Sequence, residues 1–283
     1  MKKIFPLSLL LLACLALGAC GSQQDAAAPM PTDGGDEAQI QLDPSDPLAN
    51  YLNLSQLPQE TLSACTQALN QTSENGGITA KLHKVMGDAM TLYLSLELTY
   101  PPELADKDPR TFGDSITEAT LTTADGLATG LKEQVRQIDG NTMSYLFAAS
   151  FGKEALTPGK EVTLSLSDSL SGGSAHTFQW TVETQGAFRY ADLKDDGDAM
   201  VGTVILSPFG LTSDVWKTDG LDQQALENGL VLLDQSGNAL APDAAGHGSG
   251  EGTLHLEYLF FSPLDPSGVG TVQIGPYAAQ FNA

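Results

Sequence analysis

Cysteine and basic residues are both scarce in this chain. Its 283 residues include three cysteines and 13 Lys and Arg against 35 Asp and Glu, for a formal net charge of -22. Proteins that bind nucleic acid need a basic surface, so this charge argues against a nucleic-acid partner. The chain has no cysteine or histidine pair at the spacing of zinc ligands, and its four histidines are scattered. No metal or other cofactor is therefore expected.

Long apolar runs are also missing, except within the first twenty residues. Lys2 and Lys3 precede an apolar stretch from Ile4 to Leu17. A charged start, a short apolar segment and small residues before a cleavage point are typical of a secretory signal peptide, here residues 1–19. The stretch is shorter than the about 20 residues that span a bilayer, which disfavours a transmembrane anchor.

The segment Leu17-Gly18-Ala19-Cys20 resembles the lipobox of bacterial lipoproteins. The resemblance implies that the Cys20 thiol takes a diacylglyceryl group and becomes the new N-terminus. The chain would then sit on the extracytoplasmic face of a bacterial membrane, held there by the Cys20 lipid. Without Lys2 and Lys3 it would carry 11 basic and 35 acidic residues, a net charge of -24. Cys65 would be its one thiol, which excludes an intramolecular disulfide and favours a small buried side chain.

Residues 20–53 are expected to form a disordered tether. They are rich in Ala, Gln, Asp, Gly and Pro and show no apolar period. A short helix is predicted next, because Leu62, Cys65 and Leu69 fall at helical spacing after Pro58. Asn75-Gly76-Gly77 is expected to end it.

From Ile78 onward the apolar period is two, which predicts strands. The clearest one runs from Met90 to Tyr100, with one apolar face and one polar face, and is expected to be half-buried. Turn pairs such as Asp125-Gly126 separate further alternating segments. The sequence predicts an all-β chain of two antiparallel immunoglobulin-like β-sandwich domains, at 54–185 and 186–283, with a linker from Gly186 to Asp198.

Two segments and three scattered histidines carry residues that could support chemistry. Asp192–Asp198 is acidic, but a calcium loop beginning at Asp192 would have Lys194 at its third position, so an acidic turn is favoured. Gly246–Gly252 holds His247 where the nucleophile elbow of a hydrolase needs glycine, so a glycine-rich loop is favoured. His83 and His255 lie opposite apolar faces and are expected to be solvated, and His176 lies at a strand start. No catalytic residue is predicted.

Two segments, Leu69–Thr79 and Met90–Glu97, resemble an uncharacterised extracytoplasmic domain of Gram-positive anti-sigma-factor-like membrane proteins. Ile205–Leu211 looks like the immunoglobulin-like domain that often follows it. The chain departs from that family because it has no spanning helix and no cytoplasmic sigma-binding segment. The resemblance therefore implies an extracytoplasmic β-domain without transferable catalytic residues.

Together these features favour a lipid-anchored, non-catalytic binding or sensing module for an envelope protein or ligand. Loops from Tyr100 to Phe112 and from Ala241 to Gly252 are the expected contact sites, since they are long and rich in Pro or Gly. Two alternatives stay open at this point. One is a cell-envelope hydrolase with a site assembled from separated loops, and the other is a structural spacer.

Overall fold

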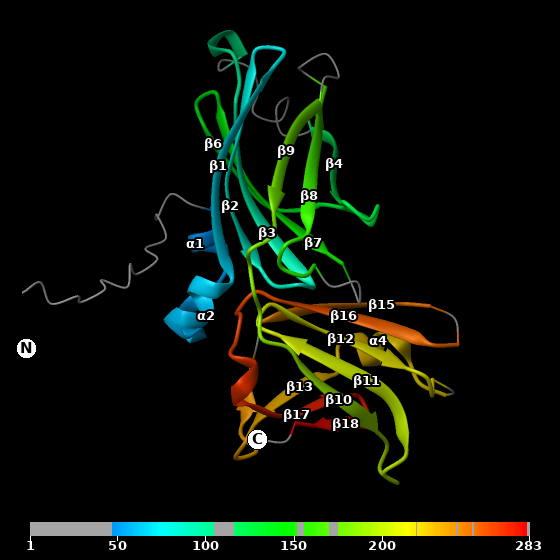
Figure 1. Ribbon diagram of the computed structural model, residues 1–283. Coiled ribbons are helices and arrows are strands. Elements are labelled where there is room, and N and C mark those ends of the chain that lie inside the picture. Colours follow the sequence, from blue (N-terminus) through cyan, green and yellow to red (C-terminus); the bar gives the residue numbers. More distant parts are fainter. Residues whose placement is uncertain are drawn as a thin grey trace, which may run out of the picture. The chain divides into compact units, whose positions relative to one another are not determined.

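The computed structural model describes residues 47–104, 116–151, 156–169, 175–218, 220–241, 243–250 and 252–281 (Figure 1). Strands dominate these residues and every strand pairing is antiparallel, which confirms the prediction of an all-β, sandwich-like chain. The signal peptide at 1–19, Cys20 and the tether up to residue 46 lie outside the described residues. Among the described helices, none has the length and apolar character that crossing a membrane requires.

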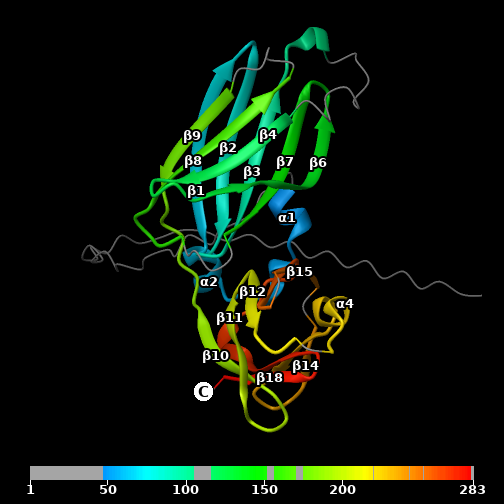
Figure 2. The ribbon, with the colours of Figure 1, turned by 90° about the vertical axis from the view of Figure 1, so that its right-hand side faces the viewer.

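The first nine strands form a two-layered lobe, called the first lobe below. One sheet has the order β1-β2-β3-β7-β6 and the other β5-β4-β8-β9. Figure 2 looks onto the second sheet with the first behind it. Alternate apolar residues such as Leu94, Phe147 and Leu164 fill the space between the layers. The strands are β1 (Thr66–Asn75), β2 (Ile78–Gly87), β3 (Thr91–Thr99), β4 (Ile116–Thr123), β5 (Ala128–Gly130), β6 (Lys132–Asp139), β7 (Thr142–Ser150), β8 (Glu161–Asp168) and β9 (Ala175–Thr181).

Side-chain amides of β1 connect the two layers. Gln67, Gln71 and Asn75 each donate a hydrogen bond to a backbone carbonyl of β9, at N···O distances of 2.9, 2.7 and 3.1 Å. Carbonyl groups on an edge strand otherwise offer a template for pairing with another chain. The polar character of β1 therefore closes this side of the lobe.

The predicted helix up to Leu69 is wrong beyond Cys65. Helix α2 covers Gln59–Ala64, and the chain then enters β1 at Thr66. The glycines expected to end a helix instead form the β1–β2 hairpin, with φ of +56° at Gly76 and +80° at Gly77. Two successive residues with positive φ make the tight turn whose twist suits a hairpin. Pairing with β2 thus overrides the local helical spacing.

Residues 47–64, here called the N-terminal clasp, comprise α1 (Pro47–Tyr51), the 3-10 turn η1 (Leu54–Gln56) and α2. The prediction that the tether extends to Asn53 is wrong for residues 47–53. Leu48 and Leu52 are 0% and 3% exposed, because they join a cluster on the outer face of the five-stranded sheet. That cluster also buries Tyr93 on β3, so β3 is covered on both faces there and is not half-buried as predicted.

The second lobe is one continuous sheet with the order β14-β13-β17-β18-β10-β11-β12-β16-β15. One face of the sheet encloses its own apolar core, which includes Leu193, Leu206, Leu256, Phe260 and Val272. The strands are β10 (Arg189–Lys194), β11 (Met200–Ser207), β12 (Gly210–Val215), β13 (Leu230–Asp234), β14 (Ala239–Leu240), β15 (Ala244–Ser249), β16 (Leu254–Phe260), β17 (Val269–Ile274) and β18 (Tyr277–Gln280). Short helical segments are η2 (Pro102–Leu104), α4 (Gln223–Glu227) and η3 (Pro266–Gly268).

The linker predicted from Gly186 to Asp198 is wrong over Arg189–Lys194, which form β10. Arg189 fixes the start of this strand by donating to the carbonyls of Pro266 and Val269 and by lying 4.8 Å from the centre of the Phe281 ring. Residues 182–188, between β9 and β10, contain no helix or strand. The predicted acidic turn is present at 195–198, but it connects β10 and β11 and does not lie between the two lobes.

Candidate functional site

The outer face of the second lobe carries two rows of mainly polar residues across β10, β11, β12, β16 and β15. Strand pairing aligns them, and alternation turns their neighbours into the core. The first row is Tyr190, Ile205, Thr212, Glu257 and His247, and the second is Asp192, Thr203, Asp214, His255 and Ser249. The first lobe contacts the β12-β16-β15 half of this face, while a solvent-open groove lies over the β10–β11 half.

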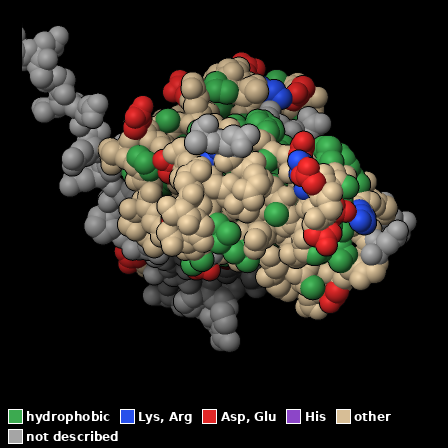
Figure 3. All heavy atoms as spheres, turned by 90° about the horizontal axis from the view of Figure 1, so that it is seen from below, with side chains coloured by type: hydrophobic (Ala, Val, Ile, Leu, Met, Phe, Trp, Pro, Cys, Tyr) green, Lys and Arg blue, Asp and Glu red, His purple; other side chains and the backbone are tan. Residues whose placement is uncertain are grey.

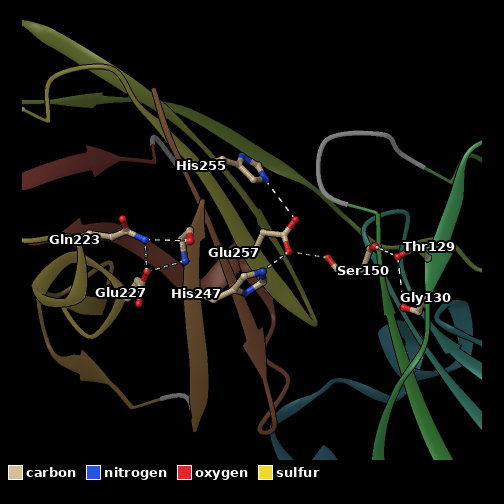
Figure 4. A network of polar contacts seen from close by, with 9 residues as sticks. Thr129, Gly130, Ser150, Gln223, Glu227, His247, His255 and Glu257 are labelled. Carbon is tan, nitrogen blue, oxygen red and sulfur yellow. Dashed lines mark hydrogen bonds and ion pairs between the residues drawn. The ribbon is translucent and has the colours of Figure 1, made fainter. Parts of the chain in front are cut away.

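A histidine and carboxylate cluster occupies the covered half (Figure 4). His255 Nδ1 lies 2.9 Å from Asp214 Oδ1, and its Nε2 lies 3.3 Å from Glu257 Oε1. His247 Nε2 approaches the other oxygen of Glu257 at 3.3 Å. Both ring nitrogens of His255 therefore face carboxylate oxygens, one from Asp214 and one from Glu257.

The cluster reaches the first lobe through Glu257. Ser150, the last residue of β7, donates from its hydroxyl to Glu257 Oε2 at 3.2 Å, and Thr129 of β5 donates to the Ser150 carbonyl at 3.0 Å. The hydrogen bond with His255 lowers the pKa of Glu257, with burial opposing and the charges of both histidines assisting. Glu257 is therefore held as a carboxylate that cross-links the two lobes.

The arrangement does not build a nucleophile. A serine hydrolase needs the hydroxyl to donate to a histidine that a carboxylate orients. Here Ser150 donates to the carboxylate itself, and both nitrogens of His255 face acids. No group of three or more His, Cys, Asp or Glu within the described ranges has an arrangement that could hold a metal ion. The contacts are those of a charged cross-link.

Asp88 forms a second contact between the lobes, at the turn between β2 and β3. Its Oδ1 accepts from the backbone N–H of Met90 and Thr91 at 2.7 and 2.9 Å, and its Oδ2 accepts from Phe209 N–H at 3.4 Å. Burial raises the pKa of Asp88, and these bonds together with one from Ser207 oppose the rise. A Cβ at Gly186 would lie 2.4 Å from Asp88 Cβ, so glycine is required where the connecting segment passes this carboxyl.

The open half of the face forms a groove of about 620 Å³ over β10, β11 and β18. Its side chains include an aromatic ring, an aliphatic chain, a hydroxyl, an amide and both charge signs, supplied by Tyr190, Ile205, Thr203, Gln280, Asp192 and Lys194. Tyr190 is 70% exposed although it lies within a strand. Lys194 Nζ bonds Asp198 Oδ1 at 2.8 Å, and this bond raises the pKa of Lys194. The groove combines hydrogen-bonding groups with one accessible ring.

The structure corrects several interpretations of individual residues. Asp195, at the centre of the acidic segment, accepts from the N–H groups of Gly197 and Ala199 at 3.0 Å and pairs with Lys217 at 2.9 Å, so it stabilises the β10–β11 turn. The predicted loop from Ala241 to Gly252 is wrong over Ala244–Ser249, which form β15. Residues 105–112 of the other predicted contact loop lie outside the part of the chain that the structure describes.

The histidines and the cysteine differ in their surroundings. His255 is not solvated as predicted, because its side chain is 26% exposed and lies between two acids. His83 is half-buried, 3.7 Å from Glu97. His176 lies in β9, fully buried, with Nδ1 3.3 Å from Ser73 Oγ, and burial lowers its pKa. Cys65 is buried as predicted, and burial followed by the charge of Asp88 raises its pKa to about 12, which keeps it an unreactive thiol.

Sequence reasoning missed the groove and the cross-lobe cluster. One signal was present: His255 and Glu257 alternate with the apolar residues Leu254, Leu256 and Tyr258, which placed both on the outer face of one strand. Their partners Asp214 and Ser150 are distant in sequence, and register alone brings the first beside His255. Tyr190 carried no distinguishing sequence signal.

Comparisons with known proteins give a likeness of fold. No family model matches the chain, and no curated protein matches it. A solved structure described as "The crystal structure of the conserved domain protein from Bacillus anthracis" is similar, with a TM-score of 0.51 and 14% sequence identity. The match covers 75% of this chain and 77% of that one. At this identity the likeness bears on the fold alone.

Proposed function

We propose that this chain is a non-catalytic binding module, lipid-anchored at Cys20 on the extracytoplasmic face of a bacterial membrane, whose ligand surface is the groove over β10, β11 and β18. The observation that carries the proposal is the contrast within one sheet face. The reactive residue types engage one another in the covered half, while the open half presents an exposed ring among hydrogen-bonding side chains. Recognition surfaces on a rigid sheet have this character.

The groove replaces the predicted contact loop at 241–252. Half of that segment, Ala244–Ser249, is a strand, and Gly248 N–H donates to the Glu227 carboxylate at 2.9 Å, so this strand is fixed in place. Thr203 and Asp192 stand on neighbouring paired strands, which hold their polar groups in a defined geometry. A preformed surface loses less conformational entropy on binding than a loop does.

Co-sedimentation with an envelope fraction of the bacterium that carries the chain tests this function. The chain from residue 21 onward contains every described residue and carries no lipid. It is expected to bind saturably, and the double variant Tyr190→Ala, Asp192→Ala is expected to lose binding. Trp216→Ala removes another exposed aromatic that does not line the groove, and serves as the control. Equal binding by the double variant and the unaltered chain would refute the groove as the ligand surface.

The membrane anchor is tested separately through Cys20→Ser. Metabolic labelling with a fatty-acid analogue is expected to mark the unaltered chain and to leave the variant unlabelled. Label that persists in Cys20→Ser would refute the anchor. Turnover of an envelope polymer that survives the groove substitutions and is lost in Ser150→Ala would instead favour the hydrolase.

A further inference from the structure

The groove has chemical properties that select among classes of ligand. It contains two carboxylates, Asp192 and Asp198, and one ammonium, Lys194, which is already bonded to Asp198. The chain as a whole carries a net charge of -22, so an anionic ligand would be repelled. A strongly cationic ligand would meet a single carboxylate not bonded to Lys194. The charges therefore favour a neutral ligand.

The groove is also too polar for an apolar ligand. Ile205 pairs directly with Tyr190 across the strands, and together they make a small apolar patch at one place in the groove. Figure 3 shows hydrophobic side chains on the lower face in small separate areas, with acidic and basic side chains close together on one side. A broad apolar surface would be expected for a lipid or for an apolar helix.

The hydrogen-bonding groups beside the ring include both donors and acceptors. Asp192 supplies carboxylate oxygens, Thr203 a hydroxyl, and Gln280 an amide whose carbonyl oxygen accepts from Thr271 Oγ1 at 2.9 Å. That bond orients the amide and leaves its nitrogen to supply N–H donors. A ligand with many hydroxyl groups, each both a donor and an acceptor, matches this set.

We propose that the groove binds a neutral saccharide chain, with the apolar face of one sugar ring lying on Tyr190. This inference rests on the proposed binding function and names its ligand class. Aromatic side chains bind through their faces while their surroundings provide hydrogen bonds, and a pyranose ring offers a C–H face with hydroxyls at its edge. The groove lies open along the sheet, so a chain can extend beyond the ring that contacts Tyr190. Asp192, Thr203 and Gln280 then hold the hydroxyl groups of that sugar.

The experiment uses the same envelope fraction in three forms: untreated, digested with protease, and treated with aqueous hydrogen fluoride to remove phosphodiester-linked anionic polymers. Binding of the chain from residue 21 onward is expected to survive both treatments and to change little between low and high salt, because no ionic contact dominates. Loss of binding at the protease step or at the hydrogen fluoride step overturns the saccharide. Failure to bind the untreated fraction overturns the proposed binding function itself.

Variants at Tyr190 test the ring contact on glycan chains released from the treated fraction. Tyr190→Ala is expected to raise the dissociation constant about tenfold, because the stacked face is lost. Tyr190→Phe keeps the face and is expected to stay near the unaltered value, as is Trp216→Ala outside the groove. Equal affinity of Tyr190→Ala and the unaltered chain for these glycans overturns the stacking of a sugar on Tyr190. Unfolding midpoints of all variants show whether each is folded.

Discussion

Strands β10 and β11 present the same outer sheet face as β12, β16 and β15, yet the two halves have different environments. Thr212 and Asp214 in the covered half are 5% and 6% exposed, whereas Tyr190 in the open half is 70% exposed. Both halves carry polar residues at alternate positions. The difference comes from the first lobe, whose Met90 and Ser150 contact Thr212 and Glu257. Coverage by a distant part of the chain, rather than residue type, separates the junction between the lobes from the open groove.

The largest effect on stability is expected from Phe209→Ala, which removes the ring that packs near Tyr93 of the first lobe. Phe209 lies on the turn between β11 and β12. It is fully buried in the apolar cluster that the N-terminal clasp forms with the five-stranded sheet, and its ring lies 6.0 Å from that of Tyr93. Truncating a buried Phe costs about 3–5 kcal/mol of unfolding free energy. Urea unfolding measures it. A loss under about 1 kcal/mol would mean that the lobes do not depend on this contact for stability.

A smaller loss is expected from Asp88→Ala, which leaves the N–H groups of Met90, Thr91 and Phe209 without their carboxylate acceptor. Loss of a buried hydrogen-bond acceptor costs about 1–3 kcal/mol, and because water can enter the space that the carboxyl leaves and bond these N–H groups, the total loss is expected to stay in that range. Asp88→Asn keeps one acceptor oxygen and serves as the matched control. Unfolding free energies that are equal for the two variants would contradict a role for the Oδ1 bonds.

The difference in unfolding free energy between Asp88→Asn and the unaltered chain is expected to depend on pH. The pKa of Asp88 is higher in the folded chain than in the unfolded chain. The contribution of Asp88 to the free energy of unfolding is therefore full below its pKa in the unfolded chain, and it is lost as pH rises through its pKa in the folded chain. Asp88→Asn does not titrate there. The disadvantage of Asp88→Asn relative to the unaltered chain is therefore expected to shrink between acidic and neutral pH.

Glu257→Gln tests the contact between Glu257 and Ser150 that links the two lobes. It is expected to lower the free energy of unfolding by about 1 kcal/mol at neutral pH. The folded pKa of Glu257 is lowered, so its contribution is present above the unfolded pKa and is lost as pH falls through the folded pKa. Unfolding curves of the variant and the unaltered chain are expected to separate at neutral pH and to converge in acid. Glu118→Gln, an exposed residue on β4, is the control. A separation that is constant with pH would contradict the ionic cross-link.

The smallest effect on stability is expected in the open half. Tyr190→Ala should change the unfolding free energy by less than about 0.5 kcal/mol, because an exposed side chain loses few contacts on truncation. Thermal or urea unfolding measures this directly. A loss approaching that of Phe209→Ala would show that the two halves share one structural role and would remove the distinction between them.

Alternation within the sequence was enough to predict most strands. Met90–Tyr100 became β3 and the alternating residues from Leu254 to Phe260 became β16, because a period of two places every second side chain on one face. Helical spacing failed at Leu69, where pairing with β2 decided the conformation. Pro47–Tyr51 had too few apolar residues to show a period, although Leu48 and Leu52 are almost fully buried.

The candidate site was less predictable, because it depends on the register in which strands pair and on which part of the sheet face the first lobe covers. Asp214 and His255 are 41 positions apart, and they meet because β12 and β16 pair in one register. Tyr190 lay in a segment that composition assigned to a linker. Its place on an open sheet face follows from β10 pairing with β11, which local residue types do not specify.

The N-terminal clasp determines where a mechanical load would enter the molecule. Tyr51 donates to Gln134 of the first lobe at 2.8 Å, while Asn53 N–H donates to the Phe261 carbonyl of the second lobe at 2.9 Å. Tension applied ahead of Pro47 would therefore act on the seam between the lobes before it acts on any strand. If Cys20 is held in a membrane and the groove is held by a fixed polymer, that seam lies on the line of force.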